Sequence, residues 1–264
     1  MTKNAPTLPD LSDHERVACQ AADAARTVTL KWFRSKLDVD SKADKSPVTI
    51  ADQQSEDIIR STILSAFPEH GFFGEESGRT AMDSEWQWVI DPIDGTKSFA
   101  TGMPTFGTLV SLLYRGEPVL GLIDHAVLEE RWIGIRGRQT THNGKTCRVR
   151  DTQQVKDAAV YTTTADMFDQ HSGPQAEKLT SQCKFRVFGG DCYSYGLVAS
   201  GYNDIVCEAD LKPYDYFALI PVVEGAGGKV TDWQGRPLTL DSPGQVLASC
   251  SESLHIKAIE LLNS

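Results

Sequence analysis

The chain of 264 residues has no uninterrupted apolar run that approaches the ~18–20 residues needed for a membrane-spanning helix. Its first residues, MTKNAPTLPDLSDHE, are polar and acidic and lack the apolar core of a signal peptide. The six cysteines form no Cys-x-x-Cys pair and the six histidines form no His-Glu-x-x-His motif, so neither a zinc ribbon nor a histidine-built metal site is indicated. These absences predict a cytoplasmic protein with buried thiols and no membrane partner.

Basic residues are also scarce, since 26 Lys and Arg stand against 36 Asp and Glu and leave a net charge of -10. A nucleic-acid partner or an anionic membrane would require a basic face, so the sequence predicts neither. The negative charge does not exclude an anionic substrate, because clustered carboxylates can bind cations and these cations can bind the anion. With 40% hydrophobic and 23% charged residues the composition is that of a globular protein, which excludes a disordered chain.

Helices and strands are expected to interleave along the chain, which contains no repeat and no low-complexity linker. Hydrophobic spacing predicts helices over 12–34, 51–66, 173–182, 191–200, 215–226 and 252–262, the first with a capping box at Ser12 and Glu15. Apolar runs between turn residues predict strands over 86–90, 106–114, 118–124, 130–136, 158–162, 185–188, 204–208, 229–232 and 245–249. This pattern predicts a mixed α and β class with two subdomains, 1–145 and 146–264, packed as one unit.

The most informative segment is DPIDGT at residues 91–96, directly after the apolar run at 86–90. A strand there delivers Asp91 at its carboxyl end, where ligands bind in many α/β sheets. The proline fixes its own φ and disfavours helix before it, so we expect a rigid turn that projects both carboxylates. Gly95 permits close approach of a ligand, and Thr96 opens a helix or turn whose N–H groups can receive an oxyanion.

Crowded carboxylates beside anion-binding amides repel one another unless cations lie between them. An all-oxygen ligand set selects a hard cation, and a few carboxylates with water and a phosphate oxygen suit Mg²⁺. Two such ions can activate water and hold the phosphoryl and leaving oxygens, which is what phosphoryl transfer requires. The other candidate acids are Asp52, the segment Gly74-Glu75-Glu76-Ser77, and Asp215.

Each of these segments also has a purely structural interpretation, and spacing in the sequence leaves both open. A Gly-Glu-Glu triplet is typical of a solvated loop, and Asp-Pro-x-Asp-Gly is an ordinary turn composition. Asp215 suits a helix N-cap, and Asp52 suits a first-turn position that the helix dipole favours.

Taken together, three segments resemble the signatures of the inositol monophosphatase family: Gly74-Glu75-Glu76-Ser77, WVIDPIDGT at 88–96, and Tyr214-Asp215 with EGAGG at 224–228. The resemblance covers residues 12–262, with the motifs in the family's order. It implies the layered α/β/α/β/α sugar-phosphatase fold and a Mg²⁺-dependent phosphomonoesterase with two to three Mg²⁺ per subunit. It also implies inhibition by Li⁺ and a homodimer.

The resemblance assigns the metal ligands position by position, with Glu75, Asp91 and the carbonyl of Ile93 at one ion, and Asp91, Asp94 and Asp215 at a second. The catalytic set that it implies is Asp52 and Thr96, which orient and deprotonate the attacking water, and Glu75, which reaches a third and looser ion. The amides of Gly95 and Thr96 are implied to hold the phosphate. Lys42 resembles the family's lysine near the metal site, with Lys45 as its rival in that loop.

Within the family, DGTKSF at 94–99, GGDCYSYG at 189–196 and EADLKPYDY at 208–216 resemble the histidinol-phosphate phosphatase branch. Inositol enzymes usually carry small residues where this chain has Asp191. Asp191 and Glu208 suit a substrate with an ammonium and an imidazole, which they could recognise through charge-assisted hydrogen bonds. The structural alternatives are a helix N-cap for Asp191 and a strand-end acid for Glu208.

Three functions follow from the sequence. The first is hydrolysis of L-histidinol phosphate to L-histidinol and phosphate, a step of histidine biosynthesis, by metal-activated water. The second is a phosphatase for inositol-1-phosphate or a related sugar or nucleotide phosphate, although the sequence offers no cradle for a nucleobase. The third is a non-catalytic metal-binding protein, against which the acids at every motif position argue.

Overall fold

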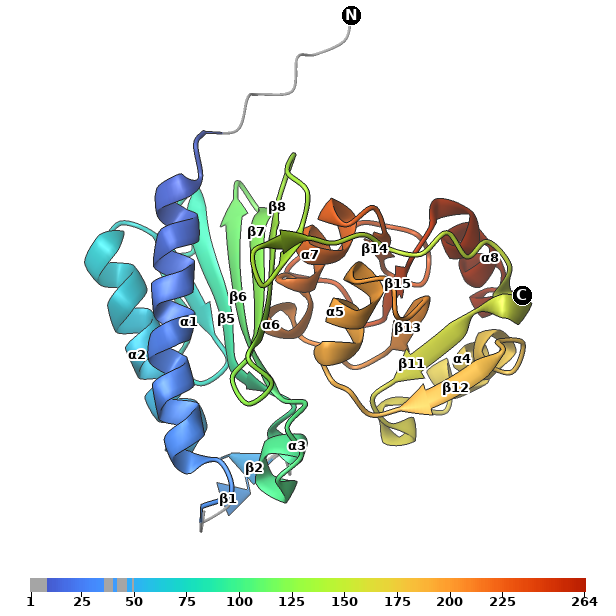
Figure 1. Cartoon of the computed structure of the whole chain (residues 1–264), viewed down its shortest axis with the longest axis horizontal. Coiled ribbons are helices and arrows are strands. Elements are labelled where there is room, and N and C mark those ends of the chain that lie inside the picture. The colour runs from blue at the N-terminus through green and yellow to red at the C-terminus, as the bar shows by residue number, and fades with distance from the viewer. Residues whose placement is uncertain (1–8, 36–39, 42–46, 49) are drawn as a thin grey trace, which may run out of the picture.

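Helices and sheets alternate as layers in the computed structural model, which describes residues 9–35, 40–41, 47–48 and 50–264 (Figure 1). Helices α1 (Ser12–Trp32) and α2 (Ile50–Ala66) pack side by side over one face of an eight-stranded sheet. Among the described residues, no helix combines the length and the apolar character that crossing a bilayer requires.

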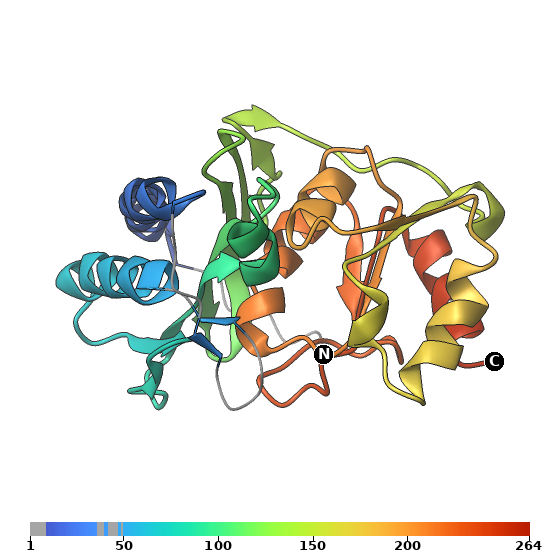
Figure 2. The ribbon, with the colours of Figure 1, turned by 90° about the horizontal axis from the view of Figure 1, so that it is seen from below.

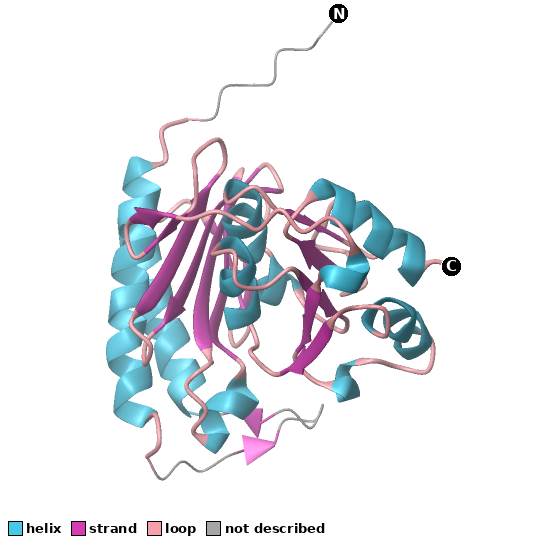
Figure 3. Ribbon diagram, turned by 45° about the vertical axis from the view of Figure 1, so that its right-hand side comes forward, coloured by secondary structure: helices cyan, strands magenta, loops and turns pink. Residues whose placement is uncertain are grey.

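A middle layer of helices separates the first sheet from a second, five-stranded sheet (Figures 2 and 3). It consists of α5 (Tyr193–Ala199), α6 (Pro213–Tyr216) and α7 (Leu219–Gly225). The far side of the second sheet carries α4 (Ser172–Thr180) and α8 (Glu252–Leu262). The order α/β/α/β/α confirms the layered mixed fold that the sequence predicts.

The eight-stranded sheet brings two of the acidic segments together at the carboxyl ends of neighbouring strands. Its order is β10 (Lys145–Thr146), β9 (Thr141–His142), β8 (Glu130–Ile135), β7 (Glu117–His125), β6 (Gly107–Tyr114), β5 (Trp86–Asp94), β3 (Gly71–Gly74) and β4 (Gly78–Thr80). Strands β3 and β5 run parallel, with Gly74 opposite Ile90. Glu75, directly after β3, and Asp91, inside β5, therefore lie side by side at the same level of the sheet.

The five-stranded sheet ends one of its strands at Glu208. Its order is β12 (Phe185–Phe188), β11 (Ala159–Thr162), β13 (Ile205–Glu208), β15 (Val246–Ser249) and β14 (Lys229–Thr231). Strands β12, β11 and β13 are parallel, and the other two pairings are antiparallel. Shorter elements complete the description: β1 (Asp40–Ser41) paired with β2 (Pro47–Val48), α3 (Thr96–Thr101), η1 (Val155–Asp157) and η2 (Ala165–Met167).

Two glycines allow α7 and the residue before it to lie directly on the first sheet. A Cβ atom at Gly121 of β7 would lie 2.0 Å from the carbonyl oxygen of Ala218, and one at Gly134 of β8 would lie 2.2 Å from that of Pro221. No side chain fits between these backbones, because real carbon–oxygen contacts are far longer. The contact seats α7, which follows the segment that carries Asp215, on the same sheet whose strand β5 carries Asp91 and Asp94.

The sequence predictions were wrong in three details. The helix expected over 215–226 is two helices, α6 and α7, because Pro221 has no N–H to bond to the carbonyl of Phe217. Strands β3 and β4 were not predicted, since β3 offers only two apolar residues between glycines. Ser12 does not cap α1: Leu11 is the N-cap, and the Ser12 hydroxyl donates to Asp10 instead. The division into subdomains at 1–145 and 146–264 stays a prediction.

We expect Gly134→Ala to lower the free energy of unfolding by about 2 kcal/mol, because the added methyl group forces α7 away from β8. Urea denaturation followed by circular dichroism measures the change. Gly173→Ala in α4 is the control, since the nearest atom to its added Cβ lies 3.7 Å away. A loss at Gly134 no larger than that at Gly173 would contradict the close contact.

Candidate active site

Three carboxylates from two layers meet at one point. Ligand oxygens of Asp91, Asp94 and Asp215 all lie within 4.8 Å of one another. Asp91 and Asp94 come from the end of β5, and Asp215 comes from α6, which packs against β5. They line a cavity of about 150 Å³ together with Glu75, Ile93, Gly95, Thr96, Thr163, Met167, Asp191, Cys192, Tyr195, Glu208, Leu211 and Leu219.

The end of β5 is shaped by its own side chains and by a shift in strand register. The amide of Ile93 donates to Asp91 Oδ1 at 2.9 Å, and the pairing of β5 with β6 shifts between Asp91 and Asp94. The hydroxyl of Thr108 on β6 holds the carbonyl of Pro92 at 2.9 Å. Gly95 then adopts φ 81° as the N-cap of α3. The DPIDG segment is therefore both a turn and the part of β5 that presents two acids to the cavity.

Backbone amides from the middle layer hold the other side of the cluster. The amide of Cys192 donates to Asp94 Oδ2 at 2.7 Å, and the amide of Lys212 donates to Asp215 Oδ2 at 2.6 Å. Asp215 lies in the first turn of α6, after Pro213. Asp215 is therefore not the N-cap that the structural interpretation expected: the N-cap of α6 is Lys212, and Asp215 is the third helical residue, whose side chain reaches back to the Lys212 amide and also lines the cavity.

Burial raises the pKa of all three acids, and repulsion from neighbouring carboxylates raises the pKa of Asp91 and Asp94 further. Burial raises the pKa of Asp91 well above its ordinary value, and the charges of Glu75, Asp94 and Asp215 raise it further. Burial and the charges of Asp191 and Asp215 do the same for the pKa of Asp94. Burial raises the pKa of Asp215 to about 7, although the Lys212 amide opposes the shift. Such a set of crowded oxygen donors fits a hard divalent cation, which would supply the missing positive charge.

Glu75 and Asp52 approach the cluster from different elements. Glu75 lines the cavity, and its amide donates to the carbonyl of Ile90 at 3.2 Å, which extends the pairing of β3 with β5. Asp52 is buried in the first turn of α2, and its charge contributes to the raised pKa of Asp91. Asp52 is not among the described residues that line the cavity. Lys42 and Lys45 lie outside the described residues.

Asp191 and Glu208 form the wall next to the cluster. Asp191 has φ 45° and accepts a hydrogen bond from the Ser98 hydroxyl at 2.6 Å. It lies so close to Gly95 that a Cβ there would be 2.6 Å from the Asp191 Cγ. Asp191 does not cap α5, because the N-cap is Cys192.

Glu208 keeps its strand-end position but also faces the cavity. Its two oxygens accept the Thr163 amide at 3.0 Å and the Tyr195 hydroxyl at 2.8 Å, while burial raises the pKa of its carboxyl. Cys192 and Tyr195 were missed as site residues although they lie in the GGDCYSYG segment. Thr163 and Met167 carried no signal in the sequence, because only the folded loop after β11 brings them to the cavity.

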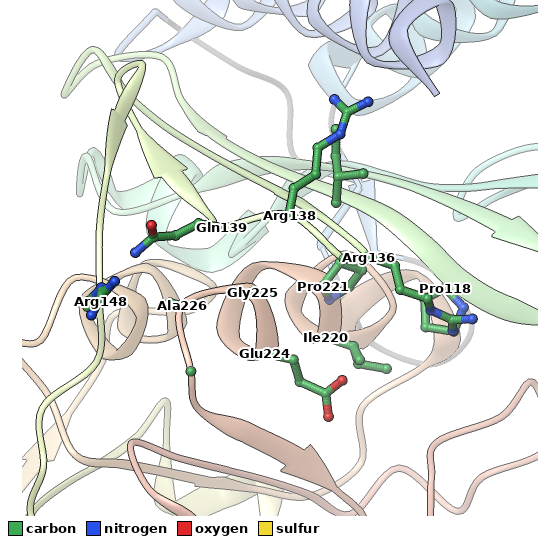
Figure 4. Close-up of a pocket in the computed structure, with 13 residues that line it drawn as sticks. Pro118, Arg136, Arg138, Gln139, Arg148, Ile220, Pro221, Glu224, Gly225 and Ala226 are labelled. Carbon is green, nitrogen blue, oxygen red and sulfur yellow. The ribbon is translucent and has the colours of Figure 1, made fainter. Parts of the chain in front are cut away.

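A larger cavity of about 610 Å³ lies along the other end of α7 (Figure 4). Its charged side chains do not point toward a common point in the cavity. Its arginines spread apart: Arg136 pairs with Glu117 at 2.5 Å, and Arg138 extends away to Glu15 at 3.1 Å. Glu224 of α7 forms an ion pair with Lys229, with 3.4 Å between Glu224 Oε1 and Lys229 Nζ. The smaller acidic cavity is therefore the candidate active site.

The model of the inositol monophosphatase family matches residues 10–264. The chain belongs to the inositol monophosphatase family. It is 43% identical to the bifunctional phosphatase IMPL2, chloroplastic, of Arabidopsis thaliana, over 96% of this chain and 77% of that protein. It is 36% identical to a histidinol-phosphatase of Chlorobaculum parvum, over 91% and 92% of the two chains.

The structure agrees with this membership of the inositol monophosphatase family. An inositol monophosphatase from Zymomonas mobilis superposes with a TM-score of 0.89 at 39% identity, covering 97% of this chain and 100% of that one. The family resemblance inferred from the sequence is therefore confirmed, and so is its fold. Phosphatases of this family generally use Mg²⁺, and the acidic cluster is a donor set that suits it.

In the metal-free protein we expect Asp215→Asn to gain stability relative to the wild type as pH rises from 5 to 8. The pKa of Asp215 is about 7 in the folded state against an ordinary 3.8, so the folded state holds the proton more tightly. The stability that this proton confers is complete below 3.8 and is lost as pH rises through about 7. Asn cannot ionise and escapes that loss.

Urea denaturation in EDTA at both pH values measures the difference between the variant and the wild type. Asp83→Asn, which removes an exposed carboxyl, is the matched control and should show no such trend. An Asp215→Asn difference that is equal at pH 5 and pH 8 would contradict the raised pKa that burial gives Asp215.

Proposed function

We propose that the protein hydrolyses L-histidinol phosphate to L-histidinol and phosphate. The observation that carries this proposal is the position of Asp191 and Glu208 beside the three clustered acids. The described lining of the cavity contains acids and apolar or neutral polar residues but no Lys, Arg or His. A substrate that brings its own positive charges to such a wall is favoured over a neutral polyol. The relatives named histidinol-phosphatase support the same choice.

The assignment of metal ligands follows the family positions and is part of the proposal. Glu75, Asp91 and the Ile93 carbonyl would hold one Mg²⁺, and Asp91, Asp94 and Asp215 would hold a second. Bound Mg²⁺ would lower the pKa of a water molecule and neutralise charge on the phosphoryl oxygens. A third ion at Glu75, sensitivity to Li⁺, a homodimer and a cytoplasmic location stay predictions.

The residues of the chain prepare the water and the phosphate for in-line displacement. The Thr96 hydroxyl donates to the Ile93 carbonyl at 3.2 Å, so its oxygen presents lone pairs to a water molecule. Thr96 would orient the water and Asp52 would accept its proton as the water oxygen bonds to phosphorus, while the ester P–O bond breaks and the departing alkoxide of histidinol takes a proton from solvent. The amides of Gly95 and Thr96, at the start of α3, hold the phosphate oxygens meanwhile.

Recognition of the alcohol falls to Asp191 and Glu208. Ser98 orients Asp191, while Tyr195 and the Thr163 amide orient Glu208, and every one of these donors is neutral. Neither carboxylate receives a charged donor in these hydrogen bonds, so each keeps lone pairs for the ammonium and imidazole of histidinol, whose positive charge would favour the ionised form of both acids. An inositol-1-phosphate phosphatase on the same scaffold is the second candidate, favoured by the likeness to the Zymomonas mobilis structure.

Phosphate release from a panel of phosphomonoesters tests the substrate. We expect kcat/KM for L-histidinol phosphate to exceed that for inositol-1-phosphate. Asp191→Asn should reduce kcat/KM for the histidinol ester about tenfold, because it removes one charge-assisted hydrogen bond. The inositol ester is the internal control and should change little in this variant. A wild-type preference for inositol-1-phosphate would overturn the substrate assignment while leaving the chemistry intact.

Asp94→Asn tests the chemistry itself. Loss of one of the three clustered carboxylates should lower kcat/KM by more than about a hundredfold at saturating Mg²⁺ for every substrate, since it removes a ligand oxygen and its charge. Treatment of the wild type with EDTA should abolish turnover, and added Mg²⁺ should restore it. Circular dichroism verifies that the variant is folded. Turnover that is unchanged in Asp94→Asn would exclude a catalytic metal site at this cluster.

A further inference from the structure

A buried glutamate outside the cavity holds the segment that carries Glu75. Glu56 on α2 is only 2% exposed, and its two carboxylate oxygens each accept one backbone amide. The amide of Glu76 donates to Oε2 at 2.7 Å, and the amide of Ser77 donates to Oε1 at 2.7 Å. Both donors directly follow Glu75, so the carboxylate fixes the backbone on the outgoing side of that residue.

The incoming side of Glu75 is fixed by the sheet. The Glu75 amide donates to the Ile90 carbonyl at 3.2 Å, one residue before Asp91. Gly74 makes room for Glu56, because a Cβ at Gly74 would lie 2.3 Å from Glu56 Oε1. Glu75 is thus held between β5 on one side and the Glu56 carboxylate on the other.

One face of α2 carries three polar residues at four-residue spacing. Asp52 lies one turn before Glu56, and Arg60 lies one turn after it. Arg60 also reaches the turn between β3 and β4, through the Ser77 hydroxyl at 3.1 Å and the Thr80 hydroxyl at 3.3 Å. The same helix face therefore positions Asp52 and holds the turn that begins with Glu75.

We propose that Glu56 is a positioning residue, which sets the Glu75 carboxylate for the metal ion through its bonds to the Glu76 and Ser77 amides. This inference rests on the proposed metal role of Glu75. A charged acceptor suits two parallel N–H donors, because charge-assisted bonds are shorter and stronger than neutral ones. Groups that orient a metal ligand in this way contribute roughly tenfold to a hundredfold to metal affinity.

Calorimetric titration of Mg²⁺ alone into the metal-free protein tests the proposal without relying on turnover. In Glu56→Gln one oxygen becomes an NH₂ group, which cannot accept an amide proton. In Glu56→Asp the charge stays, but the carboxylate is shorter by about 1.5 Å. We expect both variants to bind Mg²⁺ roughly tenfold to a hundredfold more weakly than the wild type. Their kcat should recover toward the wild-type value as Mg²⁺ is raised.

Asp57→Asn is the matched control, because it removes the same charge from the neighbouring, exposed position of α2 and should leave Mg²⁺ binding unchanged. A folded Glu56 variant that binds Mg²⁺ within twofold of the wild type would overturn the positioning role. Failure of both variants to fold would also overturn it, since Glu56 would then serve stability alone. Absence of Mg²⁺ binding by the wild type would instead refute the proposed function.

Discussion

The structure depends on placing three acids where their charges repel one another. Asp91, Asp94 and Asp215 meet in a small cavity, where burial raises the pKa of each one, so the folded chain without cations disfavours their ionised forms. The folded chain must therefore stabilise these carboxylates with its own hydrogen bonds before any cation binds. It does so with backbone amides, which donate one bond each to these carboxylates from Ile93, Cys192 and Lys212. A backbone amide orients a carboxylate but does not neutralise its charge, so the three ionised carboxylates still require a cation.

The three amide donors come from different parts of the fold, and this makes the cluster sensitive to how the layers pack. The Ile93 amide belongs to β5, whereas the Cys192 and Lys212 amides precede helices of the middle layer. A layer shift of a fraction of an ångström would separate Asp215 from Asp91 and Asp94. The absence of side chains at Gly121 and Gly134 explains how such a shift is prevented, because backbone rests directly on backbone there.

The sequence could predict those features of the site that depend on residues close together in the chain. The acids of DPIDG are close in sequence, and the proline and glycine around them constrain the same few residues, so the turn and its two carboxylates could be predicted. The meeting with Asp215 is a contact across 121 positions, and only the combined family motifs indicated it.

The residues that sequence reasoning missed act through contacts that no local pattern records. Glu56 holds amides 20 and 21 positions away, and Cys192 acts through a backbone N–H that is present in almost any residue. The single helix expected over 215–226 failed for a different reason: Pro221, whose missing N–H breaks the helix, is a local signal that the hydrophobic spacing of the segment outweighed.

Under the proposed function, the negative charge that calls for metal ions also favours a cationic alcohol. Metal ions can satisfy Asp91, Asp94 and Asp215, but Asp191 and Glu208 lie in the wall beyond them and are oriented by hydroxyl groups and one amide. A polyol could hydrogen-bond to these two carboxylates, yet it would leave their charges unmatched in a cavity from which water is displaced. An ammonium or imidazolium removes that penalty. In the proposed function, Ser98 and Tyr195 hold these two carboxylates through neutral hydroxyl groups and leave them available to a cationic alcohol, whereas an arginine in either place would already pair with them.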